Sequence, residues 1–301
     1  MKILNFGSCN IDYVYDVSHI VTKGETISVS KMEMFPGGKG LNQSIAAARA
    51  GAKIYHAGCI GSGGAFLCDT LAESGADISF LRKTDSQSGH AIIQVDENGE
   101  NCILVYKGTN GMIEKSFIDE VLQNFASGDL LLIQNEINNI EYLIDRAFEK
   151  GIKIVFNPSP FCEELKAIDL NKIYCLVLNE VEIKGFSTLE KPEEALYYLK
   201  QKYPYLNIVL TLGEKGCVFT DGSEILSHPS FEALAVDTTA AGDTFTGYFV
   251  SLIAEGKDFI EAAKYASAAA ALAVSKKGAA PSIPKMNDVE EALKILKVRT
   301  L

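Results

Sequence analysis

Short apolar runs alternate with longer amphipathic or alanine-rich stretches along most of the chain. Continuous apolar runs such as Asp129–Gln134 and Ile152–Phe156 are typical of strands buried on both faces of a sheet. Their alternation with helical stretches predicts an α/β fold with helices on both faces of the sheet. The predicted strands are Lys2–Phe6, Lys53–Ile60, Asp129–Gln134, Ile152–Phe156, Tyr174–Leu178 and Asn207–Thr211. The predicted helices are Gly38–Ala50, Ala65–Ser74, Ile140–Glu149, Glu193–Lys202, Asp243–Ala254, Phe259–Ser275 and Asp288–Lys297.

Three β-like segments lack helices that would cover them. Thr26–Phe35 alternates loosely, and His90–Asp96 and Asn101–Tyr106 flank a turn that contains Asn98-Gly99, a strong hairpin signal. These segments either form a small sheet lying over the main domain or extend the edge of the main sheet. The pattern alone supports both alternatives almost equally.

The charge balance narrows the class of partner. The 301 residues include 28 Lys and Arg against 39 Asp and Glu, a net charge of −11. Duplex nucleic acid is therefore a poor partner, because its binding draws affinity from Lys and Arg on phosphates. A small anion needs only a local positive site, so the balance does not exclude one.

The cysteines and the apolar stretches indicate a cytoplasmic protein. The seven cysteines are odd in number and form no C-x-x-C pair, which favours reduced thiols. Met1–Asn5 enters a strand-like run at once, so we expect no signal peptide. Ala266–Val274 is too short to span a bilayer, so we expect no membrane partner.

The strongest chemical motif is the small-residue loop Ala240-Ala241-Gly242, which leads directly into an apolar helix. Free backbone N–H groups and the helix dipole make such a helix start an anion site. Asp243 stands at the same end, where a carboxylate either caps the helix or takes a proton from a nucleophile. From the residues alone, capping is favoured. Asp237 is either a turn residue or an ion ligand.

A second glycine-rich loop, Pro36–Gln43, also opens a helix. Its three glycines allow close backbone approach, and Lys39 and Asn42 project from one helical turn. The loop lacks the G-x-x-x-x-G-K-[ST] spacing of a Walker A motif. The G-x-G-x-x-G fingerprint is absent too, which disfavours a Rossmann dehydrogenase.

Polar residues follow several predicted strands. In open α/β sheets, ligands bind outside the carboxyl ends of the strands. Each polar residue alone is a turn or cap, but their common placement predicts one site. These residues are Asn10, Asp12, Glu136, Asn179, Glu182 and Thr211.

Together the motifs resemble the ribokinase-like carbohydrate kinases, in the expected order and over essentially the whole chain. The segments that carry the resemblance are Gly7–Asp12, Gly37–Gln43, Asn157–Pro160, Asn179–Glu182, Thr211–Gly216 and Asp237–Gly247. The resemblance implies one kinase domain over residues 1–301, a three-layer α/β/α sandwich with a central mostly parallel sheet. It also implies a small β lid drawn from about residues 12–35 and 88–107, and a homodimer formed through that lid.

The resemblance further implies ATP-dependent phosphorylation of the primary hydroxyl of a sugar, with D-ribose giving ribose 5-phosphate. A kinase for another pentose, a ketose or a nucleoside is one alternative, and a catalytically silent sugar- or nucleotide-binding protein is another. One departure concerns sugar choice: Gly61–Phe66 lacks an acidic pair that the family often carries.

The site residues implied by the resemblance fall into five groups. Asp243 would be the general base, and the anion hole would comprise Ala240, Ala241 and Gly242. Sugar contacts would be Asn10, Asp12, Gly38, Lys39, Asn42, Glu136 and Asp243. ATP contacts would be Asn179, Thr211, Gly213, Gly216, Gly242 and Ser267. Mg²⁺ would be organised through water by Asn179 and Glu182. A monovalent cation, usually K⁺, would bind at Asp237, Thr239, Ala273, Lys276, Gly278 and Ser282.

Overall fold

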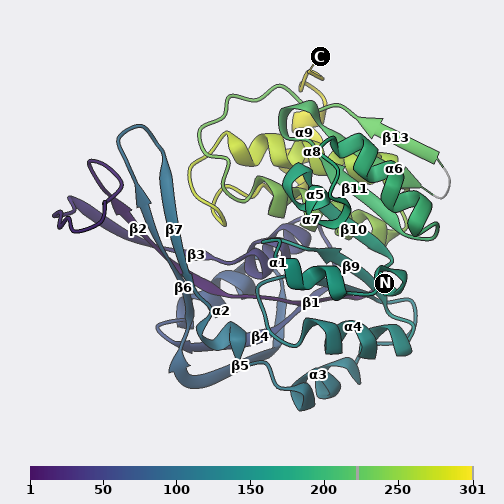
Figure 1. Cartoon of the computed structure of the whole chain (residues 1–301), viewed down its shortest axis with the longest axis horizontal. Helices are drawn as coiled ribbons and strands as arrows, with labels where there is room; N and C mark the ends of the chain where they lie inside the picture. The colour runs from purple at the N-terminus through teal and green to yellow at the C-terminus, as the bar shows by residue number, and fades with distance from the viewer. Residues whose placement is uncertain (222–223, 300–301) are drawn as a thin grey trace.

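The centre of the computed structural model, which describes residues 1–221 and 224–299, is a mostly parallel sheet (Figure 1). Its strands within these residues are β1 (Ile3–Phe6), β4 (Ile54–Ser62), β5 (Asp77–Gln87), β8 (Leu130–Gln134), β9 (Lys153–Asn157), β10 (Cys175–Asn179), β11 (Asn207–Thr211), β12 (Cys217–Asp221) and β13 (Glu224–His228). They pair in the order β13-β12-β11-β10-β9-β8-β1-β4-β5. The pairings of β12 with β11 and β13 are antiparallel, and the others are parallel.

Both faces of this sheet are apolar, and each face is covered by helices. In β8, Leu130 and Leu132 pack into one buried cluster, whereas Leu131 and Ile133 pack into the other. The first cluster lies under α1 (Lys39–Arg49), α2 (Ala65–Glu73), α7 (Ala241–Glu255), α8 (Phe259–Val274) and α9 (Met286–Leu293). The second lies under α3 (Lys115–Leu122), α4 (Ile140–Glu149), α5 (Glu180–Ser187) and α6 (Pro192–Lys202). The predicted three-layer α/β/α sandwich is therefore confirmed.

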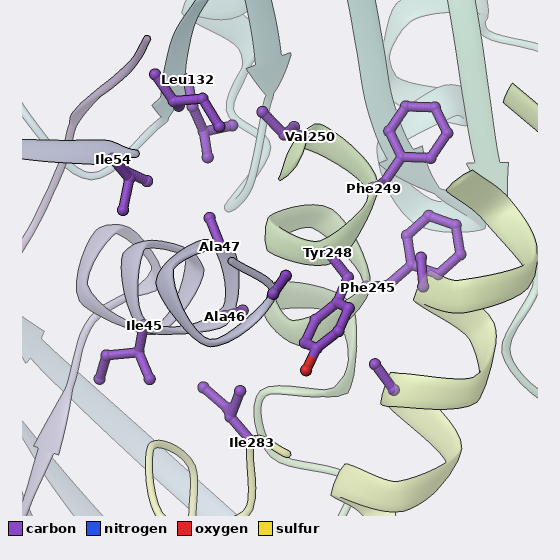
Figure 2. Close-up of a cluster of buried hydrophobic side chains, with 14 of the residues drawn as sticks. Ile45, Ala46, Ala47, Ile54, Leu132, Phe245, Tyr248, Phe249, Val250 and Ile283 are labelled. Atoms are coloured by element: carbon purple, nitrogen blue, oxygen red, sulfur yellow. The ribbon is translucent and has the colours of Figure 1, made fainter. Parts of the chain in front are cut away.

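Helices α1 and α7 cross at close range and bring the two halves of the chain together (Figure 2). A Cβ atom added to Gly247 would lie 2.5 Å from the Ala46 Cβ and 2.6 Å from the Gln43 carbonyl oxygen. Only glycine fits such a contact, so the small residues allow the helix axes to approach. Tyr248 follows on α7 and is fully buried in the cluster between the helices.

A second sheet extends away from the main body (Figure 1). It consists of β2 (Asn10–Asp16), β3 (Lys31–Gly37), β6 (Gly89–Val95) and β7 (Asn101–Tyr106), in the order β3-β2-β6-β7. β2 and β6 run parallel, and the outer pairs are antiparallel. The prediction of a small separate sheet is confirmed. The alternative of an edge extension is wrong, because these strands pair with one another.

Several element predictions needed correction. The strand predicted at Thr26–Phe35 begins only at Lys31, where its pairing with β2 starts opposite Asp16. The helix predicted at Asp288–Lys297 ends at Leu293, because the following chain pairs with the segment around Phe231 instead. The pattern also missed α3, α5, β2, β5, β12 and β13. Among the described residues, no helix combines the length and the apolar character that a bilayer crossing requires.

Candidate active site

Asp243 lies in the first turn of α7 with only 7% of its surface exposed. The Asn42 amide Nδ2 donates to its Oδ2 at 3.1 Å, and the Gln43 Nε2 donates to its Oδ1 at 2.9 Å. Two neighbouring amides of α1 therefore fix both carboxylate oxygens. The interpretation of Asp243 as a simple helix cap is wrong, because these bonds join it to a different helix.

The chain enters α7 through a strained residue. Ala240 is the N-cap and has φ of 61°, in the left-handed region that alanine rarely adopts. The Ala241 N–H donates to the Thr238 carbonyl at 3.2 Å. The N–H groups of the first helical turn have no carbonyl one turn earlier to bond to, which leaves Gly242 and Asp243 amides available to an anion.

Two further carboxylates lie close to Asp243. Burial, together with the negative charges of Glu136 and Asp243, raises the pKa of Asp12 to about 7. Burial also raises the pKa of Glu136, although Ser8 Oγ and the Lys39 backbone N–H, the latter at 2.9 Å, both donate to its Oε2. Three acidic groups thus share one poorly hydrated region.

The Lys39 ammonium group stands among these carboxylates. Burial alone would lower the pKa of Lys39, but the charges of Asp243, Glu136 and Glu182 outweigh it and raise the pKa above the ordinary value. Lys39 therefore keeps its positive charge at neutral pH. A cation here balances part of the acidic charge and offers a donor to a hydroxyl or phosphate oxygen.

The remaining predicted sugar residues join this region. Asn10 opens β2, and a Cβ on Gly38, the N-cap of α1, would lie 3.0 Å from the Asn10 nitrogen. The seven predicted sugar contacts therefore gather where the small sheet meets the carboxyl edge of the main sheet. They are Asn10, Asp12, Gly38, Lys39, Asn42, Glu136 and Asp243.

A pocket of about 260 Å³ lies on the other side of the α7 N-terminus. Five of the six predicted ATP contacts line it: Thr211, Gly213, Gly216, Gly242 and Ser267. Apolar lining comes from Phe231, Ala233, Phe245 and Ala270 among others, and the charged lining residues in the described chain are Glu214 and Arg299. The pocket reaches Gly242, so its inner end lies beside Asp243.

The sixth predicted ATP contact, Asn179, has a structural role in this arrangement. It pairs in register with Thr211 and caps α5, where its Oδ1 accepts from the Val181 and Glu182 N–H groups at 2.9 and 3.0 Å. The Glu182 carboxylate Oε2 accepts from the Asn179 N–H at 2.9 Å. Glu182 is only 4% exposed, and its negative charge acts on the Lys39 ammonium group.

Two loops behind the α7 N-terminus bring the predicted cation residues together. Asp237 accepts from the Thr239 N–H at 2.9 Å and from the Gly278 N–H at 2.8 Å. Burial pushes the pKa of Asp237 upward, but these hydrogen bonds outweigh it and hold the pKa below its ordinary value. The Lys276 N–H donates to the Ala273 carbonyl at 3.1 Å, and Ser282 is buried in the same turn region. No three His, Cys, Asp or Glu side chains within residues 1–221 and 224–299 gather as a metal site.

Some residues of the site were not predicted as such. Gln43 was part of a motif without an assigned role, yet it contacts Asp243 directly. Ser8 was visible only as part of the Gly7–Asp12 turn. Asn110 and Arg299 lie in segments with no motif, so only the folded structure reveals them.

The chain is similar to known carbohydrate kinases in both sequence and fold. Residues 1–286 match the pfkB family carbohydrate kinase description. The chain is 34% identical over 299 residues to the ribokinase of Haemophilus influenzae, which covers 95% of this chain and 96% of that protein. The crystal structure of ribokinase from Thermotoga maritima superposes with a TM-score of 0.87 at 34% identity, covering 97% of this chain and 99% of that chain. The structure of Arabidopsis thaliana ribokinase complexed with ribose and ATP gives a TM-score of 0.85 at 27% identity, over 97% and 98% of the two chains. With the fold, the two adjoining sites and these similarities in agreement, the chain belongs to the pfkB family of carbohydrate kinases.

Proposed function

We propose that the protein transfers the γ-phosphoryl group of ATP to the primary hydroxyl of D-ribose and releases ribose 5-phosphate and ADP. The observation that carries the proposal is the place of Asp243. Its oriented carboxylate lies between the cluster of sugar-type contacts and the pocket that ends at Gly242. The similar Arabidopsis thaliana ribokinase forms a complex with ribose and ATP, which supports both ligands.

In the proposed reaction, Asp243 accepts the proton of the sugar hydroxyl as that oxygen attacks the γ-phosphorus. The new bond joins the sugar oxygen to phosphorus, and the bond from phosphorus to the β–γ bridging oxygen breaks, so ADP leaves with the electron pair. Phosphoryl transfer depends on positioning and charge stabilisation. The Ala240–Gly242 loop would supply preorganised donors at the transferred group, and Lys39 would offset its charge.

Recognition of the sugar and the nucleotide would follow the two groups of residues already described. Asp12, Glu136 and Asn42 present acceptors to sugar hydroxyls, whereas Asn10 and Lys39 present donors. Thr211, Gly213, Gly216 and Ser267 would line the nucleotide, and Asn179 would support Thr211 from the neighbouring strand. In the loop that lacks the acidic pair, the Gly61 N–H donates to Ser88 Oγ at 2.9 Å, directly before β6. The absence of the acidic pair from this loop bears on sugar choice.

Two metal ions complete the proposal. Glu182 would orient Mg²⁺ through water, and its buried carboxylate fits that role. Mg²⁺, when bound, offsets the charge of the phosphate oxygens. K⁺ would lie between the loops of Asp237 and Gly278, with Thr239, Ala273, Lys276 and Ser282. The low pKa of Asp237 fits a cation ligand, because the carboxylate stays ionised.

The small sheet would act as a lid in a single kinase domain that spans the chain. A lid excludes water, which would otherwise accept the phosphoryl group. All of β7 is exposed, and the outer strands carry large apolar side chains: Met32, Met34, Ile103, Leu104, Val105 and Tyr106. Covering them with a second copy of the lid would bury this surface, so we propose a homodimer. Use of ATP together with seven free cysteines favours the cytoplasm.

A coupled ADP-release assay across pentoses, hexoses, ketoses and nucleosides tests the proposal. We expect the highest kcat/KM with D-ribose and a product that carries phosphate on C5. A higher kcat/KM with a nucleoside or another sugar would show that this compound, and not ribose, is the preferred phosphoryl acceptor. Ribose binding without turnover of ATP would favour a silent binding protein instead.

A further inference from the structure

Asn110 occupies the short 3-10 turn η1 (Gly108–Gly111) that directly follows the lid, and it is only 2% exposed. Its side chain contacts the chain a hundred residues earlier. Its Oδ1 accepts from the Cys9 N–H at 3.0 Å, while its Nδ2 donates to Asn10 Oδ1 at 2.7 Å and to the Cys9 carbonyl at 3.3 Å. One amide therefore holds both the backbone and the side chain at the start of β2.

The same amide stands where the strands of the lid enter and leave the main body. β2 begins at Asn10 and β6 begins at Gly89, its register partner. A Cβ on Gly89 would lie 2.1 Å from Asn110 Nδ2 and 2.5 Å from Asn10 Oδ1, so the three residues are in direct contact. The Asn110 N–H also donates to the Lys107 carbonyl at 3.0 Å, just after β7. The Asn110 side chain thus contacts the starts of β2 and β6, and its backbone N–H bonds to the residue after β7.

The contact determines what Asn10 offers to a ligand. A side-chain amide has one acceptor oxygen and one NH₂ donor group, which point in different directions. Asn110 Nδ2 donates to Asn10 Oδ1, so the oxygen of the Asn10 amide faces Asn110. The NH₂ group of Asn10 therefore points away from Asn110. None of the hydrogen bonds among residues 1–221 and 224–299 uses that NH₂ group. Asn10 is therefore preset as a donor next to the acceptor oxygens of Asp12 and Glu136.

We propose that Asn110 is a positioning residue for the sugar site: it fixes the amide of Asn10 as a hydrogen-bond donor and ties that donor to the root of the lid. The inference rests on the proposed sugar kinase activity, in which Asn10 contacts the sugar. Asn110 acts through Asn10 and does not touch the ligand. Its loss should weaken the sugar complex and leave the nucleotide pocket, on the far side of Asp243, unchanged.

Two variants separate this role from a merely structural one. Asn110→Ala removes the contact, and we expect KM for ribose to rise about tenfold with KM for ATP unchanged. Asn110→Asp is nearly isosteric and keeps the acceptor for Cys9 N–H, but it places an acceptor against Asn10 Oδ1. The amide of Asn10 must then reverse and present its oxygen to the sugar, so we expect Asn110→Asp to raise KM for ribose at least as much as Asn110→Ala.

A matched control lies nearby. Asn138 also bonds to backbone with both ends of its amide, since its Oδ1 accepts from the Ile113 N–H at 2.8 Å and its Nδ2 donates to the Ile113 carbonyl at 2.9 Å. Asn138→Ala should lower the melting temperature while leaving KM for ribose unchanged.

The outcomes are distinguishable. A wild-type protein that phosphorylates no ribose contradicts the proposed function. An active wild type whose Asn110→Asp variant keeps the ribose KM, or an Asn138→Ala variant that raises it as much as Asn110→Ala does, overturns the positioning role. Thermal melts of all variants identify any that fail to fold, and ribose titrations of the folded variants in the presence of a non-hydrolysable ATP analogue repeat the comparison without turnover.

Discussion

Gln43 Nε2 donates to Asp243 Oδ1 at 2.9 Å and, at the same distance, to Asn157 Oδ1. Its Oε1 accepts from Gln134 Nε2 at 2.7 Å. The candidate base is therefore joined to the carboxyl ends of β8 and β9 by a buried amide. This arrangement orients the carboxylate before any substrate binds, which is how preorganised sites lower an activation barrier.

Replacing Asp243 by Asn removes the proton acceptor and keeps the shape of the side chain. We expect kcat to fall by about 10² to 10⁴ in Asp243→Asn, because general-base catalysis contributes factors of this size. Binding of ADP, measured by calorimetry, should stay close to that of wild type. Near-normal turnover would contradict the assignment of Asp243 as the base.

Replacing Gln43 by Met keeps the volume and removes every polar contact. Asp243 Oδ1, Asn157 Oδ1 and Gln134 Nε2 each lose a buried partner. We expect the free energy of unfolding to fall by about 2–3 kcal/mol in denaturant titrations, together with a lower kcat. Gln123→Met makes the same chemical change at an exposed position and should alter neither quantity.

Asp12 couples stability to pH. Its pKa is about 7 in the folded protein because of burial and the neighbouring carboxylates, whereas an unfolded Asp titrates near 3.8. The folded state therefore holds a proton that the unfolded state has lost, and stability from this group decreases as the pH rises from 4 to above 7. We expect Asp12→Asn to melt at a higher temperature than wild type at pH 8, with a gap that narrows towards pH 4.

Although Asp12→Asn should stabilise the protein at pH 8, it should weaken ribose binding, because Asp12 is a proposed sugar contact. KM for ribose is expected to rise in Asp12→Asn while KM for ATP is unchanged. A melting difference that is equal at pH 4 and pH 8 would show that Asp12 does not titrate as described.

Arg299 is the positively charged residue that the described chain contributes to the lining of the 260 Å³ pocket. The Arg299 guanidinium pairs with the Glu214 carboxylate, and the Arg299 backbone N–H donates to the Ser230 carbonyl at 2.8 Å. We expect Arg299→Ala to raise KM for ATP about fivefold, through loss of a charged contact to the nucleotide, and to leave KM for ribose unchanged. Lys297→Ala, two residues earlier and exposed, is the control, and an equal effect there would remove the role of Arg299.

The cation site has a separate test. At constant ionic strength, replacing Na⁺ by K⁺ should raise kcat, because the loop of Asp237 and Gly278 supports the α7 N-terminus. Asp237→Asn weakens cation binding and should reduce the difference between the two salts. Equal rates in both salts for the wild-type enzyme would remove the K⁺ assignment.

The buried strands of the main sheet were predictable because both of their faces are buried, which requires apolar residues at consecutive positions. β8 differs from its predicted bounds by one residue at its start, and β9 by one residue at each end. β5 escaped prediction because it is an edge strand whose side chains alternate between half-buried and exposed, with polar residues at many positions. α5 escaped because the Asn179-x-x-Glu182 pattern was taken for a ligand motif, although it is also a capping box.

The candidate site was predictable where its residues lie in motifs and hidden where tertiary contacts create it. Glycine-rich loops and strand ends signal a ligand through local geometry alone, as in the Ala240–Gly242 loop. The contact of Asn110 with Asn10 spans 100 positions, and that of Arg299 with Glu214 spans 85. No local pattern encodes such pairs, since each depends on how the strands are ordered in space.

The crossing of α1 and α7 also has a consequence for biosynthesis. Asn42 and Asp243 touch across 201 positions, so α1 leaves the ribosome long before the residue that would take the proton. Contacts of such long range form late, because the intervening chain must first be ordered. The candidate site of a nascent chain is therefore complete only after α7 has been synthesised and has docked against α1.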